Sequence, residues 1–137
     1  APPVTGIRMR MDLTSLLAVG FGAFFGAVLR WMLGLLLNPL FPTLPLGTLS
    51  ANLLGGLLMG IAMGVFAQYG ALSPAARLFI ATGFLGGLTT FSTFSSETIN
   101  LLLRQQYAWM VAIVSAHLFG TLAMTVAGLS IVRALAR

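Results

Sequence analysis

The stretch Thr82–Glu97, TGFLGGLTTFSTFSSE, decides how this chain folds. It lies in the third of four apolar segments and is the least lipid-like part of any of them. Its three glycines weaken an α-helix, and the β-branched pair Thr89 and Thr90 follows them directly. A gap in the helix that faced lipid would leave backbone groups without hydrogen-bond partners. We therefore predict a helix interrupted near Gly86 and shielded by protein or lining a polar cavity, an arrangement that binds ions in other membrane proteins.

The composition places the chain in a lipid membrane. Of its 137 residues, 58% are hydrophobic and 7% are charged, against about 25% charged residues in a soluble domain. The basic residues are seven dispersed arginines, which we expect to anchor helix ends at the membrane edge and not to bind nucleic acid. The chain has no cysteine, so disulfides and thiol chemistry are excluded.

Four segments are long enough to cross a membrane, which takes about 20 helical residues each. We predict an all-α membrane protein with one domain over residues 1–137 and spans at 13–37, 46–68, 75–103 and 107–134. The first apolar run follows a short N-terminal stretch that lacks a small-residue cleavage pattern, so we expect a retained helix and not a signal peptide.

Small residues recur at every fourth position, which places them on one face of each helix and lets helices approach closely in lipid. Two polar residues, Arg30 and Asn52, fall on these same faces and so are expected to point at protein. The positions are Gly22, Gly26, Arg30 and Gly34, then Asn52, Gly56, Gly60 and Gly64, and finally Gly83 and Gly87.

The arginines are distributed unevenly between the two predicted membrane faces. Four spans put both termini and the loop at 69–75 on one side, near Arg8, Arg10, Arg77, Arg133 and Arg137. Arg104, and Arg30 near its helix end, lie toward the other side. The positive-inside rule taken alone favours cytoplasmic termini in a single orientation.

Polar residues inside a membrane are functional candidates by default. Asn52 could donate to a dehydrated anion or hold two helices together. Arg30 could attract anions at a pore mouth or tie helices. His117, Thr121 and Thr125 fall four apart, although each hydroxyl could instead bond to its own helix.

Phe91 and Phe94 are three residues apart and share a helix face. They could simply pack against lipid or protein, but the positive ring edges could also support an anion that has lost its water. Glu97, less than one turn beyond Thr93, could tie helices or face water. The single histidine and two separated acids give no catalytic or metal-ligating arrangement, so we expect no enzyme.

The stretch Gly83–Glu97 resembles the signature of the CrcB/Fluc family of fluoride channels, and the similarity covers essentially the whole chain. GAVLRW at 26–31 and GTLSANLLG at 47–55 match the motifs of the first two helices. The resemblance implies a passive fluoride channel of the inner membrane that expels toxic fluoride. It also implies a dual-topology homodimer of antiparallel subunits with two pores, and therefore little arginine bias.

The resemblance also assigns roles to residues by position. It implies a pore asparagine at Asn52, paired ring edges at Phe91 and Phe94, and an arginine of the first-helix motif at Arg30, which we place at the pore vestibule. A structural sodium ion at the dimer interface would be held by the backbone carbonyls of Gly86 and Thr89. The hydroxyl track maps to Ser92 or Thr93 and to Thr121 and Thr125.

Two other functions remain open from the sequence. A small proton-coupled multidrug-type exporter also has four spans and forms dimers, but it needs a carboxylate in mid-membrane, typically in its first helix. Here the first segment has only Asp12, at its edge. A non-transporting assembly subunit is the second alternative, and it predicts no ion flux from pure protein.

Overall fold

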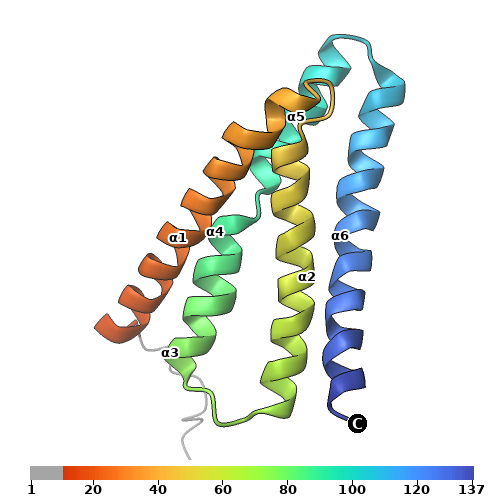
Figure 1. Ribbon diagram of the computed structural model, residues 1–137. Coiled ribbons are helices and arrows are strands. Elements are labelled where there is room, and N and C mark those ends of the chain that lie inside the picture. The colour runs from red at the N-terminus through yellow and green to blue at the C-terminus, as the bar shows by residue number, and fades with distance from the viewer. Residues whose placement is uncertain (1–10) are drawn as a thin grey trace, which may run out of the picture.

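The computed structural model describes residues 11–137, and those residues form a bundle of helices (Figure 1). Four helical stretches are long and apolar enough to cross a membrane, which confirms the all-helical, four-span prediction. These stretches are Leu13–Leu40, Leu46–Gln68, Pro74–Leu103 and Tyr107–Leu135.

Three of the spans are regular and begin and end close to the predicted positions. Helix α1 covers Leu13–Leu37 and continues as a short 3₁₀ turn, η2, over Asn38–Leu40. Helix α2 covers Leu46–Gln68 and α6 covers Tyr107–Leu135. The side-chain oxygen of Asn38 accepts from the amides of Gly47 and Thr48, at 2.7 and 3.2 Å, and so caps α2 from the end of α1.

The third span is broken, but not where the glycines predict. Its elements are α3 (Pro74–Arg77), the π-helical η3 (Leu78–Leu85), α4 (Gly86–Leu88) and α5 (Phe91–Leu103). The predicted interruption near Gly86 is wrong by three residues, because Gly86 has helical angles and the chain becomes extended only at Thr89 and Thr90.

Close packing explains why the glycines stay helical. A Cβ on Gly87 would lie 2.5 Å from the carbonyl oxygen of Ala23, and one on Gly83 would lie 2.8 Å from that of Val19. These residues therefore place α1 directly against η3 and α4, its main partners. A Cβ on Gly60 would overlap the carbonyl oxygen of Thr125, where α2 packs on α6. The predicted small-residue faces are confirmed as packing faces.

The start of α1 and the C-terminus lie at the same end of the bundle. Figure 1 shows the start of α1, the loop after α2 and the C-terminus at one end, and the loops that follow α1 and α5 at the other. Arg77 and Arg133 therefore lie toward the first end and Arg104 toward the second. Arg8 and Arg10, which entered the predicted arginine count, lie outside the described residues.

Candidate functional site

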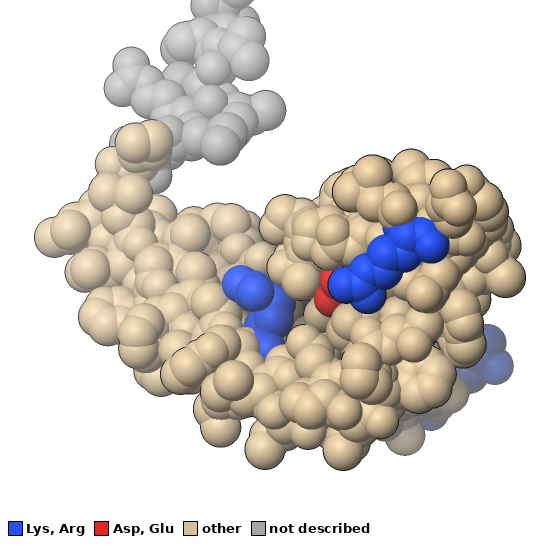
Figure 2. Space-filling model, turned by 90° about the horizontal axis from the view of Figure 1, so that it is seen from above, with Lys and Arg blue, Asp and Glu red and all other residues tan. Residues whose placement is uncertain are grey.

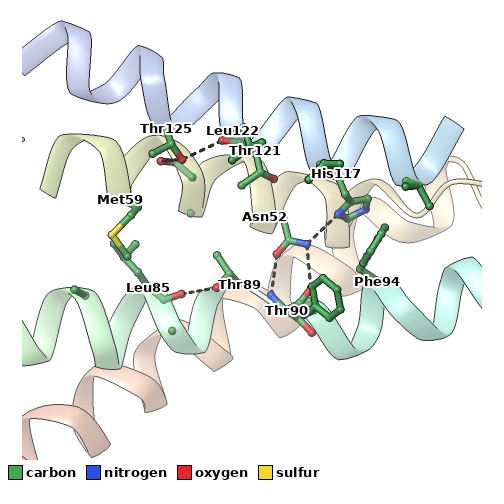
Figure 3. Close-up of a pocket in the computed structure, with 17 residues that line it drawn as sticks. Asn52, Met59, Leu85, Thr89, Thr90, Phe94, His117, Thr121, Leu122 and Thr125 are labelled. Carbon is green, nitrogen blue, oxygen red and sulfur yellow. Dashed lines mark hydrogen bonds between the residues drawn. The ribbon is translucent and has the colours of Figure 1, made fainter. Parts of the chain in front are cut away.

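The side chain of Asn52 on α2 fills the break in the third span. Its Oδ1 accepts from the backbone N–H of Thr90 at 2.8 Å, and its Nδ2 donates to the carbonyl oxygen of Thr90 at 3.1 Å (Figure 3). Thr90 has extended backbone angles and is buried, so an amide side chain replaces the hydrogen bonds that the helix gives up there.

The break changes the partners of two carbonyl groups. In a continuous helix the amides of Thr90 and Thr93 would donate to the carbonyls of Gly86 and Thr89, four residues earlier. Here the Thr90 amide donates to Asn52, and the Thr93 amide donates to Thr90 Oγ1 at 3.1 Å. The carbonyl oxygens of Gly86 and Thr89 thus lose their helical partners.

These residues border a groove of about 590 Å³ that runs between the third span, α2 and α6. Its walls include Gly86, Thr89 and Phe91 from the third span. From the other side it is bounded by Asn52 and by Thr121. The groove is open along one side of the chain and is mostly apolar, with polar groups concentrated near the break.

Asn52 also reaches α6. Its Nδ2 lies 2.9 Å from Nδ1 of His117 (Figure 3). Because the bond from the Thr90 amide fixes Oδ1, the Nδ2 amino group must donate and His117 Nδ1 must accept. His117 is therefore the tautomer with its proton on Nε2, an atom that is buried without a hydrogen-bond partner in the described part of the chain. Both Asn52 donors are thus directed at protein atoms.

The predicted pair of aromatic rings differs in environment. Phe91 and Phe94 lie with ring centroids 5.6 Å apart and an interplanar angle of 63°, an edge-to-face contact. Phe94 also packs on the His117 ring, with centroids 4.6 Å apart. Phe91, in contrast, is 81% exposed. One ring is thus fixed within the chain while the other projects from it.

The predicted hydroxyl track is only partly gathered in one place. Thr121 and Thr125 line the groove, but Thr125 Oγ1 lies 3.0 Å from the carbonyl oxygens of both Thr121 and Gly56, so its proton is directed at the backbone. Ser92 is exposed, with its hydroxyl 3.4 Å from that of Thr90. Thr93 lines a second cavity and not the groove.

That second cavity, of about 270 Å³, lies beside Arg30. The Nε of Arg30 donates to the carbonyl oxygen of Gly87 at 3.1 Å, so the arginine ties α1 to the residues just before the break. Thr48, in the same cavity wall, donates through Oγ1 to Glu97 Oε1 at 2.5 Å. Figure 2 shows this end of the molecule, where an acidic side chain lies between basic ones on an otherwise uncharged face.

Several contacts at the site cannot be predicted from the sequence. The link from Asn52 to His117 and the bond between Thr48 and Glu97 join different helices, and nothing in their spacing reveals them. Thr90 is also missing from the predicted site. A signal for it exists, because threonine is a favoured N-cap residue. Thr90 directly precedes α5, and its side chain accepts from the amide of Thr93.

The chain is similar to known proteins over most of its length. The family model described as "CrcB-like protein, Camphor Resistance (CrcB)" matches residues 17–129. A protein of Nitrosospira multiformis named "Fluoride-specific ion channel FluC" is 60% identical over 127 residues, which cover 93% of this chain and 99% of that protein. Proteins with the same name from Dechloromonas aromatica and Tolumonas auensis are 53% and 52% identical, covering 88% and 91% of this chain and 89% and 98% of theirs.

Proposed function

Since this chain belongs to the CrcB-like family, we propose that it is a fluoride-selective channel that exports fluoride passively and relieves fluoride toxicity. The single observation that carries this function is the 60% identity, over nearly the full length of both chains, to a protein named as a fluoride-specific ion channel. The chain is a multi-pass membrane protein and a channel, not an enzyme. In bacteria such a protein lies in the inner membrane.

The physics of fluoride sets what the pore must provide. Fluoride holds its hydration shell tightly, so a selective path must replace water with compact donors and still release the ion. The membrane potential drives an anion outward with ~2.3 kcal/mol per 100 mV, so no coupled energy source is needed. We assign the donors to Asn52 and to the hydroxyls of Thr121 and Thr125, and the ring edges to Phe91 and Phe94. The Thr125 hydroxyl can donate to fluoride only when its proton turns away from the carbonyl oxygens of Thr121 and Gly56.

The structure adds a condition to the role of Asn52. Both of its amide protons point at protein acceptors, the Thr90 carbonyl and His117 Nδ1. For Asn52 to donate to fluoride, the ion must take the place of one of these acceptors. Rotation of the His117 side chain can release its bond to Asn52, whereas the Thr90 carbonyl belongs to a backbone that Asn52 holds in place. Ser92, Thr93 and the vestibule residue Arg30 remain candidates for the approach to this point.

The rival functions fit the chain less well. An exporter coupled to protons needs a carboxylate within its cavity, and α1 contains no acidic residue. Asp12 caps the start of α1, where its Oδ1 accepts from the Ser15 amide at 2.8 Å. A non-transporting subunit would leave the shared name of the relatives without an explanation.

We propose that two antiparallel copies form the working unit. The support is the groove, since Asn52, Thr89 and Thr121 line an open side that in a single chain would face hydrocarbon. Phe91, at 81% exposed, also projects where a second chain could enclose it. A dimer would cover these groups, and the family resemblance favours inverted subunits despite the arginine bias.

We further propose that a sodium ion lies between the two subunits. Carbonyl oxygens are ligands for hard cations. Two such oxygens, on Gly86 and Thr89, have lost their helical partners and belong to residues that line the groove. Two copies would contribute four oxygens. Carbonyl oxygens of this kind fit a sodium ion. The ion would hold the break and the interface together and would not itself be transported.

The dimer and its orientation can be tested together. The chain has no cysteine, so a single Arg137→Cys change gives a unique label at the C-terminus. In intact cells, an impermeant maleimide should label about half of the molecules if insertion is dual and the dimer is inverted. Labelling of all molecules or of none would show a single orientation and overturn the antiparallel dimer. Fluoride conduction itself is tested by efflux of fluoride from liposomes that contain only the purified protein.

A further inference from the structure

The two cavities near the break share one lining residue, Thr90. The groove lies on one side of it, with Asn52 and the aromatic rings. The smaller cavity lies on the other side, with Arg30, Thr48 and Thr93. No other described residue lines both cavities. Thr90 is therefore the wall between the arginine side and the aromatic side of the break.

The backbone of Thr90 is held firmly in this wall. Asn52 binds both its amide and its carbonyl group, and the residue is 9% exposed. The side chain begins α5, since Oγ1 accepts from the Thr93 amide at 3.1 Å. The position of the hydroxyl is thus fixed by three hydrogen bonds from two elements.

The hydroxyl proton of Thr90 is not used by these bonds. An O–H group has one proton to donate, and Oγ1 acts as an acceptor toward Thr93. The one other hydroxyl recorded beside it is that of Ser92, at 3.4 Å, beyond the usual O–H···O range of about 2.5–3.0 Å. Thr90 therefore holds a buried hydroxyl proton at the wall between the cavities, and its one acceptor among the described residues is the weakly placed Ser92 hydroxyl.

We propose that Thr90 is a specificity-determining residue of the channel, with its hydroxyl donating to fluoride as the ion crosses from the Arg30 cavity to the groove. The methyl group of the same side chain narrows the crossing and disfavours larger anions. This inference rests on the proposed fluoride conduction. It adds a donor one residue before Phe91. Without this hydroxyl, the ion would have no donor to bridge its path between Thr93 and Asn52.

The competing explanation is that Thr90 is only an N-cap for α5. Serine, asparagine and aspartate are all good N-caps, so a pure cap would accept any of them. A donor to an anion would accept serine, would fail as valine, and would fail as aspartate, which is an acceptor when ionised and repels fluoride.

The test measures fluoride and chloride efflux from liposomes with Thr90→Ser, Thr90→Val and Thr90→Asp, each first checked as an assembled dimer. We expect Thr90→Val and Thr90→Asp to lower fluoride efflux by about tenfold or more, the effect of losing one hydrogen bond to a charged group. We expect Thr90→Ser to keep fluoride efflux and to raise the chloride-to-fluoride ratio, because the methyl group is gone.

Each outcome decides between the two roles. Wild-type fluoride efflux from an assembled Thr90→Val or Thr90→Asp dimer would overturn the inference and leave the channel function intact. If neither variant assembles, Thr90→Ser decides alone, and an unchanged chloride-to-fluoride ratio overturns the specificity role. An absence of fluoride efflux from the unmodified protein would instead overturn the proposed function.

Discussion

Asn52 binds Thr90 on both sides of its backbone, accepting from its amide at 2.8 Å and donating to its carbonyl at 3.1 Å. This pairing lets a membrane helix stop for two residues without leaving that amide and carbonyl unsatisfied. It also directs the amide of Thr90 away from Gly86, whose carbonyl loses its helical partner. A single side chain on α2 therefore supplies both replacement hydrogen bonds for the backbone of Thr90.

The first prediction concerns this clamp. Asn52→Ala should lower the free energy of unfolding by ~1–3 kcal/mol for each buried backbone group left unpaired, and should abolish fluoride efflux. Asn100→Ala is the control, because Asn100 is exposed at the far end of α5. Thermal unfolding in detergent and efflux from liposomes measure the two effects. An Asn52→Ala protein with normal stability would show that the clamp is unimportant.

The two phenylalanines should respond differently. Phe91→Ile should leave the folding of the single chain unchanged, because Phe91 is 81% exposed. It should nevertheless reduce fluoride efflux about tenfold, which corresponds to a barrier to fluoride passage raised by ~1.4 kcal/mol. Phe94→Ile should also lower the unfolding temperature, since Phe94 packs on His117. If efflux of Phe91→Ile fell only in proportion to loss of the dimer, its ring would serve packing alone.

A third prediction separates packing glycines from free ones. A Cβ on Gly60 would overlap the Thr125 carbonyl oxygen, so Gly60→Ala should destabilise the protein by ~1–3 kcal/mol. A Cβ on Gly20 meets no heavy atom within 4 Å, so Gly20→Ala is the matched control. Thermal unfolding compares the two. Equal unfolding temperatures for both variants would contradict the close contact of α2 with α6.

Gly86 gives a prediction about the proposed dimer and the proposed sodium ion. A Cβ there has its nearest recorded neighbour 3.8 Å away, so the single chain tolerates it. Harm from Gly86→Ala must therefore come from outside the chain, from a second subunit or a bound ion. We expect a weaker dimer and a loss of the stabilisation that sodium gives over a larger organic cation. Gly20→Ala again serves as the control, and a Gly86→Ala protein that keeps both properties would remove Gly86 from the interface.

The sequence predicts the fold well where the signal is local. The bounds of α1 and α2 follow from runs of apolar residues that end at Asn38 and at Tyr69. The predicted position of the break is wrong because helix propensity overstates how strongly glycine disrupts a helix that is packed within a membrane protein. Contacts with α1 hold Gly83 and Gly87 in helices, and the chain opens only where Asn52 supplies replacement bonds.

The sequence predicts which residues form the site but not which of them bind one another. Asn52, Phe91 and Phe94 were identified from residue type and from the family signature, and the structure brings them to one groove. The partners of Asn52 were not, because a bond to His117 depends on how α2 and α6 rotate about their axes. The same holds for Thr48 and Glu97, whose elements meet only in the folded chain.

The most direct test of fluoride conduction is efflux from liposomes that contain only the purified protein. Because a channel moves net charge, fluoride should leave rapidly when a potassium ionophore balances that charge, and slowly without it. An equal chloride gradient should give little efflux, since the larger ion gains less from the same donors. Fluoride release no faster than from empty liposomes, or release that needs a proton gradient and not the ionophore, would contradict a passive fluoride channel.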